Sequence, residues 1–341
     1  MVVGATSLVL MKLADLSEAQ LVSHFRRSFP RGERTIIGIG DDCAQVAAPE
    51  GSFVVTTDVM VEDQHFHFSW SSGYEVGARV AAQNLADIDA MGGRPSALVA
   101  SVVAPRDMDA EVFFDVVRGM GERARLAGAG VVGGDLSAGE KLVISVTAFG
   151  YCPGPVVRRD GARAGDVVAV SGTLGFSYAG LDLLEGGFVD PAARGREELG
   201  DLDPFLRTYR APQPPLGSGV AAAAAGAHAM MDLSDGPAAD ATRMAMASGV
   251  VIEFDRGAME REALLLEVPA GVCGADPLRW VLQGGEEHGM LAAFPQGSLL
   301  PEGFRAVGWV RDCGAAESAR ALFDGEVLRG AWDHFSSDSV D

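Results

Sequence analysis

Four apolar, β-branched segments of this chain each end in aspartate, a residue that binds cations and orients reacting groups. They span 35–42, 53–58, 131–135 and 229–235. Acids at the ends of strands are a common basis for a site in α/β proteins. For a single aspartate, a role in a turn or a helix cap would be the better interpretation. Asp235 fits that alternative best, because a Gly-Pro pair follows it and proline opens helices. Four instances in one chain favour a shared site.

A further carboxylate lies on a helix expected over 76–91. On that helix Asn84 and Asp87 share one stripe with the apolar Val80 and Met91. Polar groups buried in this way need partners. From the sequence alone, a coordinated cation and an ordinary hydrogen-bond network are equally good explanations for these buried polar groups.

These candidates are carboxylates accompanied by Thr and Ser hydroxyls, with no Cys/His cluster. Hard oxygen ligands suit Mg²⁺ rather than zinc. Several converging acids repel one another, which implies bound metal. Because Mg²⁺ usually completes its coordination with phosphate and water, the expected ligand is a polyphosphate such as ATP. Asp89 falls on another face of the helix, where we expect solvent.

The familiar nucleotide-binding and nucleophile motifs are absent. Segment 38–43 lacks the third glycine of a dinucleotide fingerprint, and segment 134–141 carries Glu140 where a Walker A lysine would stand. There is no GxSxG elbow, and no cysteine has an adjacent histidine. Covalent nucleophilic catalysis therefore has no clear candidate.

The elements that must position these residues indicate a mixed α/β (α+β) fold. The 341 residues, 48% of them hydrophobic and 44 of them glycine, alternate short β-branched runs with Ala-rich helical runs. That length predicts two domains, with the boundary between 152 and 153, before a turn-rich stretch and a strand at 167–170. Capping-box spacing of Ser17 and Gln20 predicts an early helix. We expect the proline-rich stretch 201–219 to be a long connection between elements.

The net charge of the chain limits the kinds of partner that we expect it to bind. Asp and Glu total 47 against 27 Lys and Arg, a formal net charge of −20, and no basic run is present. We therefore expect neither nucleic acid nor an anionic membrane as a partner. No apolar stretch approaches the roughly 18 residues of a membrane helix. Four scattered cysteines and a poor signal peptide favour a cytoplasmic location.

In their order along the chain, the motifs resemble those of the thiamine-monophosphate kinases. That family belongs to a superfamily with aminoimidazole ribonucleotide synthetase, selenophosphate synthetase and a hydrogenase maturation factor. The resemblance covers about 17–335. Its motifs are GIGDDCA at 38–44, TTD at 56–58 followed by His65-Phe66, NLADIDAMGGRP at 84–95, GGD at 133–135, SGTLG at 171–175, MDLSDG at 231–236, GGEE at 284–287 and WDHF at 332–335.

The resemblance implies a two-domain fold like that of aminoimidazole ribonucleotide synthetase, with mixed sheets flanked by helices. Its first domain, 1–152, would bind ATP and Mg²⁺ and form a homodimer. Its second, 153–341, would contribute nucleotide- and substrate-binding loops. The implied activity is that of a phosphotransferase: direct in-line transfer of a phosphoryl group from ATP to thiamine monophosphate, giving thiamine diphosphate in the last step of its biosynthesis.

The resemblance also implies roles for individual positions. Several Mg²⁺ ions would be held by Asp42, Thr56, Thr57, Asp58, Asp87, Asp135, Asp232 and Asp235. Of these, Asp42, Asp87, Asp135 and Asp235 would be catalytic. ATP would contact Gly134, Asp135, Arg159 and Ser234, and thiamine monophosphate would contact His65, Glu286 and Trp332.

Simpler interpretations exist for three of these residues. Arg159 could be a solvated linker arginine, His65 a strand histidine packed beside Phe66 and Phe68, and Trp332 a packing anchor.

Two other functions remain open from the sequence. One is a different ATP-dependent synthetase of the same superfamily, against which the His65-Phe66 and WDHF elements count. The other is a catalytically silent nucleotide- and Mg²⁺-binding regulator, which the intact set of aspartates disfavours. The segment 284–290 departs from the family's GGEDYEL, which leaves the shape of the substrate pocket open.

Overall fold

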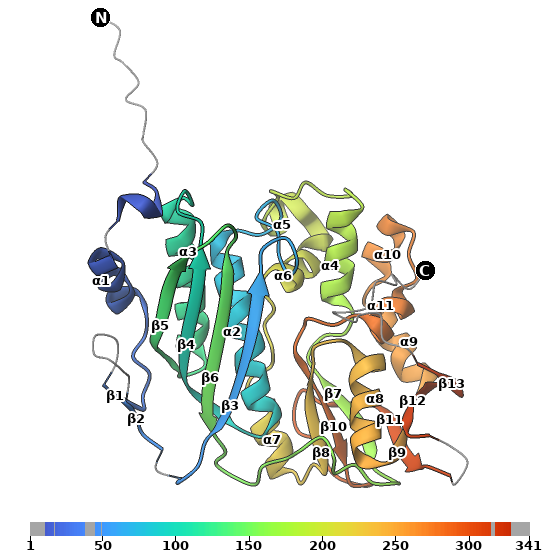
Figure 1. Ribbon diagram of the computed structural model, residues 1–341. Helices are drawn as coiled ribbons and strands as arrows, with labels where there is room; N and C mark the ends of the chain where they lie inside the picture. Colours follow the sequence, from blue (N-terminus) through green and yellow to red (C-terminus); the bar gives the residue numbers. More distant parts are fainter. Residues whose placement is uncertain (1–10, 17, 38–44, 49, 315–317, 329–341) are drawn as a thin grey trace, which may run out of the picture.

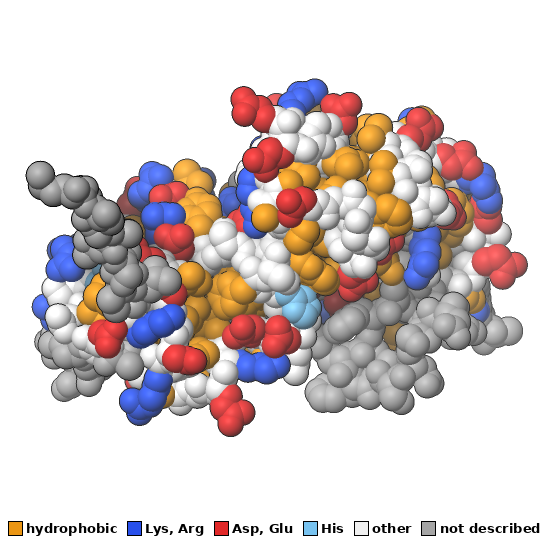
Figure 2. Space-filling model, turned by 90° about the horizontal axis from the view of Figure 1, so that it is seen from above, with side chains coloured by type: hydrophobic (Ala, Val, Ile, Leu, Met, Phe, Trp, Pro, Cys, Tyr) orange, Lys and Arg blue, Asp and Glu red, His pale blue; other side chains and the backbone are white. Residues whose placement is uncertain are grey.

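The computed structural model describes residues 11–16, 18–37, 45–48, 50–314 and 318–328. Two separate sheets, each flanked by helices, lie side by side (Figure 1). The predicted mixed α/β class is confirmed. No helix in the described ranges is long and apolar enough to cross a membrane. Figure 2 shows acidic and basic side chains interspersed over the face seen from above.

The first half of the chain forms a small hairpin and a four-stranded sheet of order β3-β6-β4-β5, which we call the N-terminal sheet. Its elements are η1 (Leu13–Asp15), α1 (Glu18–Ser28), β1 (Thr35–Ile37), β2 (Gln45–Val46), β3 (Val54–Val61), α2 (Gly73–Ala90), β4 (Arg94–Ala104), α3 (Ala110–Leu126), β5 (Gly130–Ala138) and β6 (Val143–Tyr151). The helix predicted from Ser17 is α1, although Ser17 itself lies outside the described residues.

Helices α2 and α3 pack on one face of the N-terminal sheet (Figure 1). They approach closely because glycines stand at the contact: a Cβ on Gly77 would lie 1.9 Å from the Val116 carbonyl oxygen. The opposite face carries exposed apolar side chains of β3 and the residue before it, including Phe53, Val55 and Val59. The N-terminal sheet is therefore covered by helices of this chain on one face.

The second half forms a mixed seven-stranded sheet of order β13-β12-β9-β11-β7-β10-β8, the C-terminal sheet. Its strands are β7 (Val167–Ser171), β8 (Ala229–Leu233), β9 (Val250–Phe254), β10 (Gly289–Phe294), β11 (Arg305–Asp312), β12 (Arg320–Phe323) and β13 (Glu326–Val327). Its helices are α4 (Phe176–Glu185), α5 (Gly195–Leu199), η2 (Gly200–Leu202), α6 (Asp203–Arg210), α7 (Ser218–Ala224), α8 (Pro237–Ser248), α9 (Arg256–Leu264), α10 (Glu267–Cys273) and α11 (Pro277–Gln283).

Two sequence expectations about these elements were wrong. The stretch 201–219 is not a plain connection, because Pro204 stands in the first turn of α6 and its fixed φ suits that place. Two of the first-half strands do not end at their aspartates: the ladder of β3 with β6 continues past Asp58 to the pair Val61 and Val143, and β5 runs on past Asp135. Asp58 is therefore a mid-strand residue whose side chain points to one face of the sheet.

Helix α2 joins the two halves, since it packs on β3 and β6 and also contacts β8 and α7. Asp89, near its C-terminal end, is buried rather than solvated, which corrects the sequence expectation. Its carboxylate oxygens accept hydrogen bonds from the backbone N–H groups of Gly217 (3.1 Å) and Gly219 (3.0 Å) at the start of α7. Asp89, on α2, thus accepts hydrogen bonds from backbone N–H groups at the N-terminus of α7, which have no acceptor within α7 itself.

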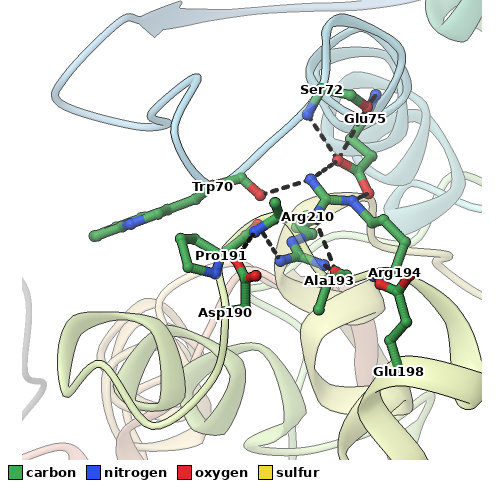
Figure 3. A network of polar contacts seen from close by, with 10 residues as sticks. Trp70, Ser72, Glu75, Asp190, Pro191, Ala193, Arg194, Glu198 and Arg210 are labelled. Carbon is green, nitrogen blue, oxygen red and sulfur yellow. Dashed lines mark hydrogen bonds and ion pairs between the residues drawn. The ribbon is translucent and has the colours of Figure 1, made fainter.

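A second set of contacts joins the halves at the other end of α2 (Figure 3). Arg194, before α5, forms a two-pronged ion pair with Glu75 in the first turn of α2, at 3.0 and 3.1 Å, and donates to the Trp70 carbonyl oxygen at 3.0 Å. Arg210 is buried beneath this segment and donates to the carbonyl oxygens of Ala193 and Pro191. The segment before α5 is therefore held to both halves.

Candidate active site

Three aspartates predicted as metal ligands lie where β3, α2 and β8 adjoin, close enough for their charges to interact. We call Asp58, Asp87 and Asp232 the carboxylate site. Strand alternation turns Thr56 and Asp58 toward α2. There the Thr56 hydroxyl donates to Asp87 Oδ2 at 2.6 Å. Asp232 comes from the edge strand β8, which contacts α2. The site thus draws on both halves of the chain.

The acids of the carboxylate site disturb one another. Burial raises the pKa of Asp87 to about 7, and the charges of Asp232 and Asp58 add to that rise. Burial also raises the pKa of Asp58, with Asp232 adding to the effect and His288 opposing it. Mutual repulsion of this kind marks a place built for positive charge.

His288, which lies in the segment 284–290 that departs from the family pattern, supplies part of that positive charge. Its Nδ1 lies 3.2 Å from Asp232 Oδ2. Burial alone would lower the pKa of His288, but the hydrogen bond to Asp232 and the charges of Asp232 and Glu286 outweigh it and raise that pKa to about 9. Its buried Nε2 has no hydrogen-bond partner in the structure.

The loops that carry the SDG and GGEE motifs lie against each other beside this site. Glu286 N donates to the Ser234 carbonyl oxygen at 2.9 Å. A Cβ on Gly285 would lie 2.2 Å from that oxygen, so only glycine fits there. The structure therefore brings the predicted ATP residue Ser234 next to the predicted substrate residue Glu286.

Asp235 is held by a basic residue outside the carboxylate site. Its carboxylate forms an ion pair with Arg243 on α8 at 2.5 Å, and α8 begins at Pro237 as the Gly-Pro pair predicted. Arg243 also pairs with the fully buried Asp240 at 2.6 Å. Burial, then the charges of Asp232 and Asp235, raise the pKa of Asp240 to about 7. Sequence reasoning missed Asp240 and Arg243, although their three-residue spacing on a helix is typical of an ion pair.

The predicted substrate end is marked by Glu286 and His65. Glu286 pairs with Arg79 at 2.7 Å, and its side chain is 47% exposed. His65 is close enough to help lower the pKa of Glu286. His65 lies in a turn after β3, not in a strand, and its Nδ1 accepts a hydrogen bond from Val61 N at 3.0 Å.

Other predicted residues lie apart from the carboxylate site. Thr57 and Asp135 are on strands at opposite edges of the N-terminal sheet, and register places both on its open face, away from α2. Gly134 precedes Asp135 on the edge strand β5. Arg159 is exposed, and its carbonyl oxygen accepts from Ser248 at the C-terminal end of α8, the far end from Ser234.

Asp42 and Trp332 lie outside the described residues, so their assignment to metal and substrate stays a prediction.

The donors present suit Mg²⁺, although they do not form a closed cage. In the part of the chain that the structure describes, no group of three or more His, Cys, Asp or Glu side chains could hold a metal ion by itself. The carboxylate site and Thr56 nonetheless offer only oxygen donors, apart from the nearby imidazole of His288. Mg²⁺ commonly binds one or two carboxylates and takes its other ligands from phosphate and water, which fits this open arrangement.

Comparison with known proteins assigns the class first. Residues 40–152 match the family model described as AIR synthase related protein, N-terminal domain. The N-terminal sheet and its helices are therefore of the AIR synthase-like class.

More similar proteins narrow the class to one family. Thiamine-monophosphate kinase of Mycobacterium tuberculosis is 42% identical over 95% of this chain and 93% of its own length. The crystal structure of thiamine-monophosphate kinase from Stenotrophomonas maltophilia matches with a TM-score of 0.75 at 26% identity, covering 93% of this chain and 99% of its own. AaThiL complexed with AMPPCP and TMP matches with a TM-score of 0.71 at 29% identity, covering 96% and 100%. The chain belongs to the thiamine-monophosphate kinase family.

Proposed function

We propose that this protein transfers the γ-phosphoryl group of ATP to thiamine monophosphate and releases thiamine diphosphate and ADP. The observation that carries the proposal is the meeting of Asp58, Asp87 and Asp232 between the two halves, in a chain that belongs to this kinase family. Neither a different synthetase nor a silent regulator is needed to explain an acidic site of this kind.

The chain's own residues contribute positioning rather than a nucleophile. The acceptor phosphate is largely ionised near neutral pH, so direct in-line attack needs no strong base and no phosphoenzyme. Thr56 holds the Asp87 carboxylate in place, and the SDG and GGEE loops hold Ser234 beside Glu286. The ATP phosphates would lie toward the carboxylate site, and the acceptor would lie toward Glu286 and His65.

Mg²⁺ belongs to the proposal as the partner of the carboxylate site. Asp58, Asp87 and Asp232 would hold it together with Thr56, and Asp42 would join them. When bound, Mg²⁺ screens the phosphate charge and the repulsion among the acids. Asp235 is engaged by Arg243 and would have to exchange that partner to reach a metal. Only the resemblance to the family supports the roles assigned to Thr57, Asp135, Gly134 and Arg159.

The division into an ATP-binding and dimerising domain at 1–152 and a loop-bearing domain at 153–341 is also part of the proposal. Its support is the open apolar face of the N-terminal sheet, where Phe53 is 60% exposed and Val55 54%. Exposed apolar patches of this kind mark interfaces. A homodimer through this face would also enclose Thr57 and Asp135. Cytoplasmic location and the absence of nucleic-acid and membrane partners stay predictions from sequence.

A single incubation tests the activity. Purified protein receives ATP, Mg²⁺ and thiamine monophosphate, and chromatography follows thiamine diphosphate and ADP together, with free thiamine as the control acceptor. We expect equal amounts of both products, from the monophosphate only. ADP without thiamine diphosphate would point to another synthetase of the class, and neither product would point to a silent binder.

A further inference from the structure

A polar stripe on α2 faces the junction between the two sheets. Arg79, Gln83 and Asp87 are four residues apart in sequence, so their side chains follow one face of the helix. Each faces a different part of the proposed site: Asp87 accepts from Thr56, Gln83 lies close enough to Asp58 to help lower its pKa, and Arg79 pairs with Glu286. The proposed function gives no role to Gln83 or Arg79, and Arg79 is the one of the two that carries a charge.

Arg79 is a buried cation with partners from the other half of the chain. Its side chain is only 5% exposed. One guanidinium nitrogen donates to Glu286 Oε2 at 2.7 Å, and the other donates to the Tyr209 carbonyl oxygen at 3.2 Å. The guanidinium also lies 5.1 Å from the centre of the Tyr209 ring. This fork fixes its direction more firmly than a single contact would.

Glu286 needs such a neighbour to keep its conformation. Its φ of +74° lies in the left-handed region, which non-glycine residues seldom adopt unless the surrounding structure imposes it. The Glu286 backbone N–H donates to the Ser234 carbonyl oxygen, and the Glu286 carboxylate accepts a hydrogen bond from Arg79. Partial burial acts to raise the pKa of Glu286, but Arg79, with His288 and His65, holds it below its usual value.

We propose that Arg79 is a positioning residue that fixes the Glu286 carboxylate at the acceptor-substrate end of the site. The proposal rests on the proposed function, in which Glu286 contacts thiamine monophosphate. Arg79 and Asp87 are eight residues apart, about 12 Å along a helix axis. Loss of Arg79 therefore weakens the acceptor end and leaves the ATP end nearly intact.

The test separates KM for thiamine monophosphate from KM for ATP in three variants. Arg79→Met should raise KM for thiamine monophosphate about tenfold or more, with KM for ATP changed by less than about twofold. Arg79→Lys keeps the positive charge but not the fork to Glu286 and Tyr209, so its KM for thiamine monophosphate should lie between those of the wild type and Arg79→Met. Arg118→Met is the matched control, because Arg118 lies exposed on α3 and pairs only with Asp115 among its described ion pairs. An unchanged KM for thiamine monophosphate, or an equal rise for both substrates, would overturn the proposal.

A double-mutant cycle distinguishes positioning from general support of the fold. If Arg79 acts through Glu286, Arg79→Met should add less than about twofold to KM in a Glu286→Gln background. Fully additive effects would contradict the proposal. Should Arg79→Met fail to fold, Arg79→Lys completes the same cycle. A wild type that forms no thiamine diphosphate would overturn the proposed function instead, and calorimetric binding of thiamine monophosphate would then still test Arg79.

Discussion

At the scale of single residues, Glu287 is an acid buried beside the first turn of α4. Its Oε1 accepts a hydrogen bond from Ser177 N at 2.9 Å. Burial raises its pKa from 4.5 to about 8. Because the folded-state pKa lies above the unfolded one, the protonated acid favours the folded state at low pH. That stability is lost as the pH rises from about 4.5 through about 8.

Glu287→Gln removes this ionisation and keeps the acceptor oxygen. In the absence of ligands it should raise the melting temperature at pH 8.5 by about 3 °C or more and flatten its decline above pH 6. Scanning calorimetry over this pH range measures both effects. Glu260→Gln, at an exposed helix pair with Arg256, serves as the control. An unchanged pH dependence in Glu287→Gln would show that Glu287 does not ionise in the folded protein over this range.

Residue chemistry was predictable from sequence where the signal was local. The aspartates of the TTD, NLAD and MDLSD motifs could be found as a set, and Asp58, Asp87 and Asp232 do meet. Arg79, Asp240 and His288 could not be identified in the same way, because their roles depend on partners from distant segments. The buried Asp89 was misjudged for that reason: its partners are backbone N–H groups 128 and 130 residues away.

At the scale of elements, the segment before α5 depends on the Arg194 contacts. Arg194→Met removes the two-pronged pair with Glu75 and the bond to the Trp70 carbonyl oxygen, and should cost about 1–2 kcal/mol of stability. Hydrogen exchange should become faster across 188–202 and around Glu75. Arg196→Met, two residues further along and paired at the surface with Asp201, is the control and should change neither. Unaltered exchange in Arg194→Met would contradict this role.

Helix ends were more predictable than strand ends. Proline fixes backbone conformation locally, so the start of α8 at Pro237 followed from the sequence. The end of β3 did not, because strand length is decided by pairing with β6, far along the chain. Helix α6 was missed, since a proline that opens a helix also resembles a loop signal.

At the scale of the whole molecule, the open face of the N-terminal sheet predicts self-association. Val55→Asp places a charge on the edge strand β3 of that face, among its exposed apolar side chains, and should convert a dimer, of twice the 35.5 kDa chain mass, into a monomer. Light scattering coupled to size exclusion measures the mass. Leu299→Asp replaces a side chain that is 92% exposed elsewhere and should leave the dimer intact. A wild type that is already monomeric would refute the proposed dimer.

The carboxylate site joins both halves of the molecule, and one comparison on α2 tests whether phosphoryl transfer takes place there. Thiamine diphosphate formation and melting temperature are measured for the wild type, Asp87→Asn and Asp89→Asn at saturating ATP, Mg²⁺ and thiamine monophosphate. Asp87→Asn should lower the rate by about 10²-fold or more without lowering the melting temperature, because it removes a repelled carboxylate. Asp89→Asn should lower the melting temperature, because an amide has one acceptor oxygen where the carboxylate accepts from both Gly217 N and Gly219 N, and it should keep the rate within about threefold. A near-normal rate in Asp87→Asn would contradict the proposed site.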